Sequence, residues 1–121
     1  MKSPDEMKND SFSVRTACLE DAPAIATVQV KSWQRIYRGI MSDSHLDGLE
    51  PARREAVWHR VLSEGNQQLH VCTNPSGILG FSNAGVSRDS PSDAEVYAIY
   101  VHPDHWGKGC GRALFLESCA A

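Results

Sequence analysis

Residues 94–114 read AEVYAIYVHPDHWGKGCGRAL and carry the clearest structural signal in the chain. The first part, 94–101, is almost continuously apolar, which is typical of a central strand that is covered on both faces. A glycine-rich turn follows over 102–110, and residues 111–121 favour a helix. The sequence therefore predicts a strand that leads through a tight turn directly into a helix.

The turn has the composition of an anion-binding site. Gly107, Gly109 and Gly111 stand at alternate positions, and glycine lets the backbone come close to a ligand. Successive N–H groups near a helix N-terminus attract anions, and Lys108 and Arg112 add positive charge. We therefore expect a phosphate or pyrophosphate group to bind here, and we expect a side chain at Gly109 or Gly111 to prevent that binding.

Patterns upstream of the turn predict the remaining elements. Asp21 and Pro23 are typical of a helix start, Pro51 opens a second helix and Gly65 ends it. The turn residues at 74–77 join two strands into an antiparallel hairpin. The expected elements are a strand at 12–16, helices at 22–37 and 51–64, and hairpin strands at 69–73 and from 78, with loops at 40–50 and 87–93.

Length and composition indicate one globular domain. The chain has 121 residues, 41% of them hydrophobic and 22% charged, which argues against a disordered or fibrous protein. A formal net charge of −3 argues against a dedicated nucleic-acid binder, and no apolar stretch is long enough to span a bilayer. The N-terminus lacks the apolar region of a secretory signal. We expect a flexible tail at 1–10, a domain at 11–121 and a cytoplasmic location.

Cysteines and histidines do not form a metal-binding motif in this sequence. His102 and His105 flank a proline, but no second pair of ligands accompanies them at zinc-binding spacing. The cysteines contain no CxxC pair, so we expect reduced thiols, most of them ordinary core residues. The cysteines are Cys18, Cys72, Cys110 and Cys119. We predict no metal site.

Known phosphate-binding motifs fit the turn poorly. It lacks the GxxxxGK[ST] pattern of a Walker A loop. It departs from the dinucleotide pattern GxGxxG because Arg112 stands where a glycine is needed, and no chain remains for a further strand–helix–strand unit. From the residues alone, a turn that merely makes a tight connection stays open as an alternative.

The segment resembles motif A of the GNAT superfamily of acetyl-CoA-dependent N-acetyltransferases. In that motif, [Q/R]-x-x-G-x-[G/A] follows a strand that ends in an apolar-V-x-P run. Gly109 and Gly111 match the glycine positions, and IYVHP at 99–103 matches the strand end. Trp106 stands in place of the family's Gln or Arg, where it still supplies a backbone N–H. The order of elements is also similar, and SWQRIYRGIM at 32–41 resembles the substrate-side helix and loop of many members.

The resemblance implies an α/β fold with a mixed, mostly antiparallel sheet flanked by helices. It also implies acetyl-CoA as co-substrate, with the pantetheine arm along the strand and the pyrophosphate on the N–H groups of the turn. The residues that would bind it are Ile99, Tyr100, Val101, Trp106, Gly107, Lys108, Gly109, Cys110, Gly111 and Arg112.

The implied reaction is transfer of the acetyl group to a primary amine of a small molecule or peptide, by direct attack on the thioester. Glu95 lies 14 residues before Gly109, where some histone-type members of the family carry a general base. Burial beside Val96 and Tyr97 would make this carboxylate a stronger base. The alternative is that Glu95 is solvated or pairs with an arginine.

Because the recognisable pattern stops at the motif A helix, we expect residues 11–121 to be the N-terminal two thirds of a family domain, truncated after that helix. The missing fifth strand would leave one edge of strand 94–101 open, which favours self-association, most simply as a homodimer. Two alternatives to an active enzyme stay open. One is a non-catalytic acyl-CoA-binding or interaction module, and the other is a phosphate-binding regulatory domain without transfer chemistry.

Overall fold

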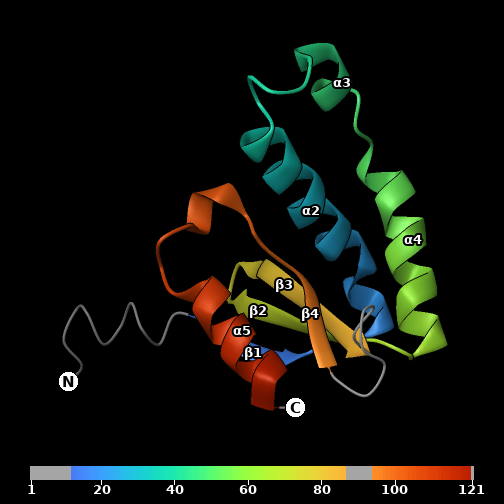
Figure 1. Cartoon of the computed structure of the whole chain (residues 1–121), viewed down its shortest axis with the longest axis vertical. Coiled ribbons are helices and arrows are strands. Elements are labelled where there is room, and N and C mark those ends of the chain that lie inside the picture. Colours follow the sequence, from blue (N-terminus) through green and yellow to red (C-terminus); the bar gives the residue numbers. More distant parts are fainter. Residues whose placement is uncertain (1–11, 87–93, 121) are drawn as a thin grey trace.

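The computed structural model describes residues 12–86 and 94–120 (Figure 1). The expected tail at 1–10 and the expected loop at 87–93 lie outside the described residues. The strands are β1 (Ser13–Thr16), β2 (Gln68–Asn74), β3 (Gly77–Val86) and β4 (Ala94–Val101). The helices are α2 (Ala22–Ile36), α3 (Asp43–Asp47), α4 (Pro51–Glu64) and α5 (Cys110–Ala120), with the short 3-10 helices η1 (Leu19–Asp21) and η2 (Pro103–His105). No described helix has the length and apolar character needed to cross a membrane.

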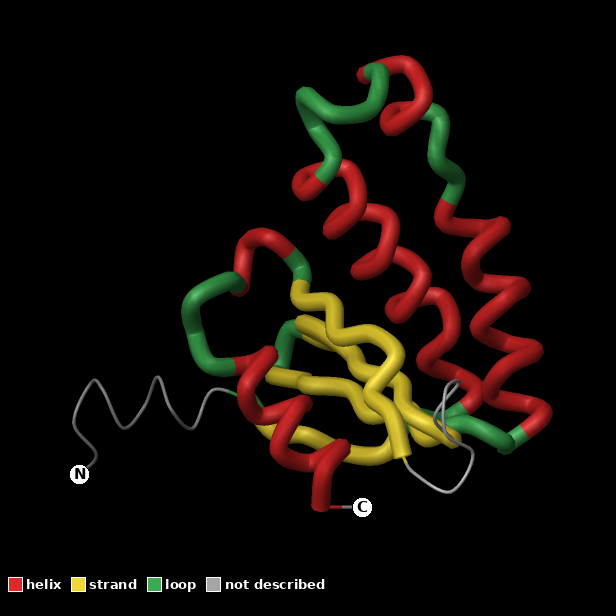
Figure 2. The backbone as a smooth tube through the Cα atoms, in the orientation of Figure 1, coloured by secondary structure: helices red, strands yellow, loops and turns green. Residues whose placement is uncertain are grey.

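The described strands form one sheet in the order β1-β2-β3-β4, and each neighbouring pair is antiparallel. The hairpin expected around 74–77 is the β2–β3 connection, with Val71 opposite Phe81. α2 and α4 lie on one side of this sheet and α5 lies on the other (Figure 2). The expected α/β fold, a mostly antiparallel sheet flanked by helices, is therefore confirmed.

Two apolar cores fill the spaces between the sheet and its helices. Between the sheet and the α2–α4 layer, Trp58 and Phe81 meet edge to face, with ring centroids 5.1 Å apart. The buried members of this core are Ala22, Ile25, Ala26, Val28, Trp58, Leu69, Val71 and Phe81. Under α5, the buried members are Cys72, Leu79, Cys110 and Leu114. On β2, the neighbours Val71 and Cys72 face opposite cores, as the two-residue period of a strand requires. On β3, a register shift leaves Leu79 as an extra residue, so that Leu79 and Phe81 also face opposite cores.

β4 lies at an edge of the sheet, with β3 as its strand neighbour. Residues 95–101 are half-buried, as the expected open edge of this strand implies. Both faces of the strand are covered, since Tyr100 packs on the α2–α4 core while Val101 packs on the α5 core. The pairing with β3 shifts between Asn83 and Ala84, which leaves Tyr97 as an extra residue in β4. This bulge locally bends the strand.

The helix boundaries follow the signals in the sequence. α2 has proline in its first turn, and α4 begins at Pro51 and ends at Gly65, whose φ of 68° is a left-handed cap. Gly39, expected to break the first helix, has a φ of 89°. The segment 40–50, expected as a connection with turns, also contains α3.

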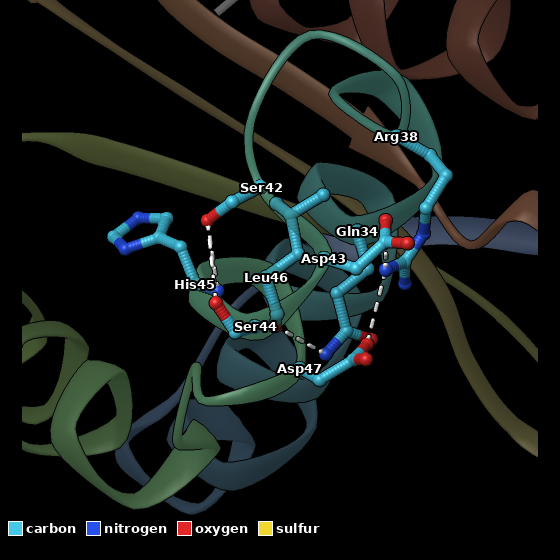
Figure 3. A network of polar contacts seen from close by, with 8 residues as sticks. All are labelled: Gln34, Arg38, Ser42, Asp43, Ser44, His45, Leu46 and Asp47. Carbon is cyan, nitrogen blue, oxygen red and sulfur yellow. Dashed lines mark hydrogen bonds and ion pairs between the residues drawn. The ribbon is translucent and has the colours of Figure 1, made fainter.

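α3 is fixed to the end of α2 by polar contacts (Figure 3). Arg38 reaches Asp43 at 3.2 Å and Asp47 at 3.1 Å. The Gln34 amide donates to the Leu46 carbonyl at 3.0 Å, and the Leu46 side chain is buried. These contacts set the position of the C-terminal half of α2, which faces the glycine-rich turn.

Candidate functional site

The glycine-rich turn joins β4 to α5 through η2 and residues 106–109. Gly107 and Gly109 have φ values of 79° and 87°, in the left-handed region that residues with a Cβ seldom adopt. The His105 N–H donates to the His102 carbonyl at 2.8 Å, which closes the η2 turn. The predicted succession of strand, tight turn and helix is therefore present.

The N-terminus of α5 presents backbone donors toward the turn. The N–H of Ala113 donates to the Gly109 carbonyl at 3.0 Å, so the N–H groups of residues 110–112 precede the hydrogen-bond ladder of the helix. Lys108 and Arg112 are exposed beside them. Their charges add to the positive end of the helix dipole. This arrangement suits a phosphate or pyrophosphate group.

The glycines of the turn serve different purposes. A Cβ at Gly107 would meet nothing within 4 Å, and one at Gly109 would lie 3.9 Å from Phe12 Cζ. Positive φ, and not crowding, therefore explains glycine at these two positions. A Cβ at Gly111 would lie 3.7 Å from Val101 Cγ2, an ordinary contact. Gly111 thus lies against Val101 of β4, and its Cβ would meet no obstacle among the described side chains.

The Val101 carbonyl at the end of β4 ties the turn to α2. It accepts hydrogen bonds from the indole Nε1 of Trp106 at 2.7 Å and from the hydroxyl of Ser32 at 3.0 Å. The Arg35 guanidinium lies over the Trp106 ring, 5.9 Å from its centroid. Trp106, which replaces the polar residue of the family motif, therefore holds the turn through its side chain.

The free edge of β4 presents backbone groups next to the turn. The His102 N–H donates to the Leu79 carbonyl of β3 at 2.7 Å. Because the hydrogen-bonding direction alternates along an antiparallel strand, the backbone groups of Ile99 and Val101 point away from β3. No described strand covers this edge. An extended ligand with amide groups can pair with it as a further strand would.

Glu95 lies at the other end of β4. It is opposite Gly85 in the register and is half-buried. At the rise of an extended strand, six residues place it roughly 20 Å from Val101. The structure thus brings the residues expected to bind CoA together at one end of β4 and leaves Glu95 at the opposite end.

Cys110 and His105 have shifted pKa values near the turn. A hydrogen bond with the Cys72 sulfur raises the pKa of Cys110, and burial acts in the same direction. Cys110 therefore stays a thiol and offers the turn its backbone N–H. Burial, aided by the charge of Lys108, lowers the pKa of His105 and so favours its neutral form.

The rings of His102 and His105 lie 6.0 Å apart. In the described part of the chain, no three His, Cys, Asp or Glu residues gather as metal ligands would.

A hollow of about 510 Å³ lies between α2 and η2. We call it the basic hollow; it is lined by Lys31, Gln34, Arg35, Arg38, His102, Pro103 and Asp104. Sequence reasoning associated 32–41 with the substrate side of the family but did not find this site. Lysine and arginine on a helix ordinarily mark a solvated face, and the hollow forms only when η2 folds back beside α2.

Comparisons with known proteins agree with this geometry. Residues 30–120 match the model of the acetyltransferase (GNAT) family. The chain is 34% identical over 108 residues to the uncharacterized N-acetyltransferase YuaI of Bacillus subtilis, an alignment that covers 87% of this chain and 61% of YuaI. It is 24% identical over 113 residues to a spermidine N(1)-acetyltransferase of Thermoplasma acidophilum, covering 89% of this chain and 68% of that protein. The chain therefore spans about three fifths of the length of YuaI.

A solved structure shares the fold. The PaiA N-acetyltransferase of Thermoplasma acidophilum, crystallised in complex with coenzyme A, superimposes with a TM-score of 0.71 at 22% identity. The match covers 91% of this chain and 70% of that one.

Proposed function

The chain belongs to the acetyltransferase (GNAT) family, and on that basis we propose that it transfers an acetyl group from acetyl-CoA to a primary amine of a small molecule or peptide. The observation that carries the proposal is the anion-binding turn placed directly beside the free edge of β4. CoA contains a pyrophosphate, which the turn would bind, and a pantetheine arm with amide groups, which the strand edge would bind.

The residues present fit CoA. Left-handed Gly107 and Gly109 allow the tight path of the turn, and apart from its chain neighbours no described residue would come within 4 Å of a Cβ at Gly107. The N–H groups at 110–112 and the charges of Lys108 and Arg112 would bind the pyrophosphate. The outward N–H and carbonyl of Ile99 and the outward N–H of Val101 would hold the pantetheine amides, with Tyr100 and Trp106 keeping the strand end and the turn in place.

The chemistry assigned to the chain is positioning and proton transfer. Bound acetyl-CoA supplies a thioester carbonyl as the electrophile. The amine nitrogen forms a bond to the carbonyl carbon, the carbon–sulfur bond breaks, and the sulfur leaves with the electron pair as a thiolate. Outward N–H groups of β4 orient the carbonyl oxygen. We propose Glu95 as the general base, which accepts the amine proton directly or through water once the pantetheine arm has carried the acetyl group along β4 toward this residue.

Calorimetric titration with CoA and with ATP tests the binding half of the proposal. We expect CoA to bind and ATP, which lacks the pantetheine arm, to bind at least about tenfold more weakly. Replacing both Lys108 and Arg112 by alanine should weaken CoA binding about tenfold at low salt and flatten its salt dependence, because exposed charges are screened. The Arg53→Ala/Arg60→Ala variant removes the same charge from exposed positions on α4 and serves as the control.

Release of free thiol from acetyl-CoA, measured over a panel of amines, tests the transfer half. Amine-dependent release supports the enzyme. Tight CoA binding with no release of free thiol in the presence of any amine would favour the non-catalytic acyl-CoA-binding module instead. Equal affinity for ATP and CoA would contradict both and point to a general phosphate-binding domain.

A further inference from the structure

We propose that the basic hollow binds an anionic group of the acceptor, so that the preferred acceptor is an amine that also carries a carboxylate or a phosphate. This inference rests on the proposed function and names the substrate class for it. It excludes a polyamine as the preferred acceptor.

The charge of the hollow comes from one face of α2 and from the segment that follows it. Lys31 and Arg35 stand four residues apart, which places them on the same side of the helix, and Arg38 follows just beyond the end of the helix at Ile36. α2 contains no acidic residue. Lys31 and Arg35 therefore face the hollow without an acid on their own helix to neutralise them.

Two of the cations are available to a ligand. Arg38 is already paired with Asp43 and Asp47. Within the described residues, no carboxylate lies within ion-pair distance of Lys31 or Arg35. Asp104 is on the rim, with its side chain 82% exposed. One solvated carboxylate at the rim leaves a net positive hollow, and a polycation would be repelled from it.

Arg35 is an exposed lining residue of the hollow that contacts Trp106. Its guanidinium lies over the ring of Trp106, whose indole N–H donates to the Val101 carbonyl. Stacking on an aromatic ring leaves the in-plane N–H groups of a guanidinium available to a carboxylate or phosphate. Arg35 is thus oriented before a ligand binds, which lowers the entropic cost of binding.

The hollow adjoins the end of β4 where the pantetheine arm would lie. His102 lines it and directly follows Val101. Ser32, next to Lys31 on α2, donates to the Val101 carbonyl at 3.0 Å and fixes the helix against the strand. An acceptor whose anionic group sits in the hollow is therefore held at the end of β4 where the pantetheine arm would pair.

An anion in this place has two sources, the acceptor or the 3′-phosphate of CoA. Calorimetry on the chain saturated with CoA separates them, because CoA carries no acetyl group and the ternary complex does not react. The probes are two matched pairs, L-leucine with L-leucinamide and glucosamine 6-phosphate with glucosamine, and spermidine as the polycation. The same titrations are repeated without CoA, so that a failure of CoA binding, which would count against the proposed function, leaves the anion preference measurable.

We expect the anionic member of at least one pair to bind about tenfold more tightly than its neutral twin, the effect of one charge-assisted contact. Arg35→Gln and Lys31→Gln should each remove most of this preference, and Arg35→Lys, which keeps the charge, should restore part of it. Arg60→Gln, an exposed position on α4, should leave it unchanged. CoA and dephospho-CoA should bind all these variants alike.

Three results would overturn the inference. The first is equal binding of both members in both pairs, and the second is tighter binding of spermidine than of any anionic probe. The third is a loss of affinity for CoA but not for dephospho-CoA in Arg35→Gln, which would assign the hollow to the 3′-phosphate.

Discussion

Asp21 is a buried carboxylate that fastens the end of β1 to the start of α2. It accepts from both terminal nitrogens of Arg15, at 2.8 and 2.9 Å, and from the Cys18 N–H at 2.8 Å. The hydrogen bonds from Arg15 lower the pKa of Asp21 below its usual value of 3.8, against the opposing effect of burial. The charged form is thus favoured in the folded chain.

Replacing Asp21 by asparagine should lower the free energy of unfolding at pH 7 by about 1 to 3 kcal/mol, because charged hydrogen bonds are lost from a buried site. The folded pKa is depressed, so this stabilisation is complete above the unfolded pKa and disappears as the pH falls through the folded pKa. Urea unfolding at pH 7, 5, 4 and 3 measures it. The gap between wild type and Asp21→Asn should stay constant down to about pH 5 and then narrow as the pH falls; a gap that does not narrow between pH 5 and pH 3, or is absent at pH 7, would show that the carboxylate does not contribute in this way.

At the scale of elements, Gly109 and Gly111 should respond differently to alanine. Gly109→Ala forces a side chain into left-handed backbone and should cost about 1 to 2 kcal/mol of stability, shift the turn, and weaken CoA binding about tenfold. Gly111→Ala adds a Cβ at 3.7 Å from Val101 inside α5, where alanine favours the helix. Its melting temperature should hold or rise, and its CoA affinity should stay within about threefold of wild type. Thermal melts and calorimetry compare the two, and equal losses in both would contradict this division of roles.

Elements bounded by strong local signals were predictable from the sequence. Pro51 and Gly65 mark α4 because proline and glycine act through their own backbone, whatever the tertiary context. α3 was not predictable as a helix, since five residues are too few to show a period. The open edge of β4 was expected only from the family resemblance and not from the apolar run 94–101 itself. An apolar run reports packing on both faces but not whether a neighbouring strand is present.

The candidate site also has a part that was predictable from the sequence and a part that was not. Its turn was predictable because glycine spacing, Lys108 and Arg112 are contiguous in the sequence. The basic hollow was not, since it forms between Lys31 and Arg35 on α2 and His102, about 70 residues later, a separation on which local pattern has no bearing. Trp106 illustrates the same limit: the motif marks it as a departure, while its hydrogen bond to Val101 emerges only from the fold.

For the whole molecule, the free edge of β4 affects stability, ligand binding and association between chains. The strand carries outward backbone groups at Ile99 and Val101, and the turn and the basic hollow both adjoin its end. A partly buried backbone N–H or carbonyl without a hydrogen-bond partner lowers the stability of the folded chain, so pairing these groups is favourable. The edge is therefore both the place where a pantetheine arm would pair and the surface through which two chains would associate. These two uses compete.

We expect the chain to self-associate with rising concentration, and we expect CoA both to suppress this association and to raise the melting temperature. The pantetheine amides would pair with the strand edge that a second chain otherwise uses, so CoA would suppress association. A ligand that binds only the folded state also raises the free energy of unfolding, by about 2.7 kcal/mol at a concentration one hundred times its Kd. Light scattering over a concentration series, and thermal melts with and without CoA, measure the two effects. ATP is the control, because it supplies adenine and phosphates but no amide arm to lie along the strand, so it should leave the association unchanged. A chain that stays monomeric at every concentration, with a melting temperature that CoA does not move, would mean that β4 needs neither a second chain nor a ligand at its edge.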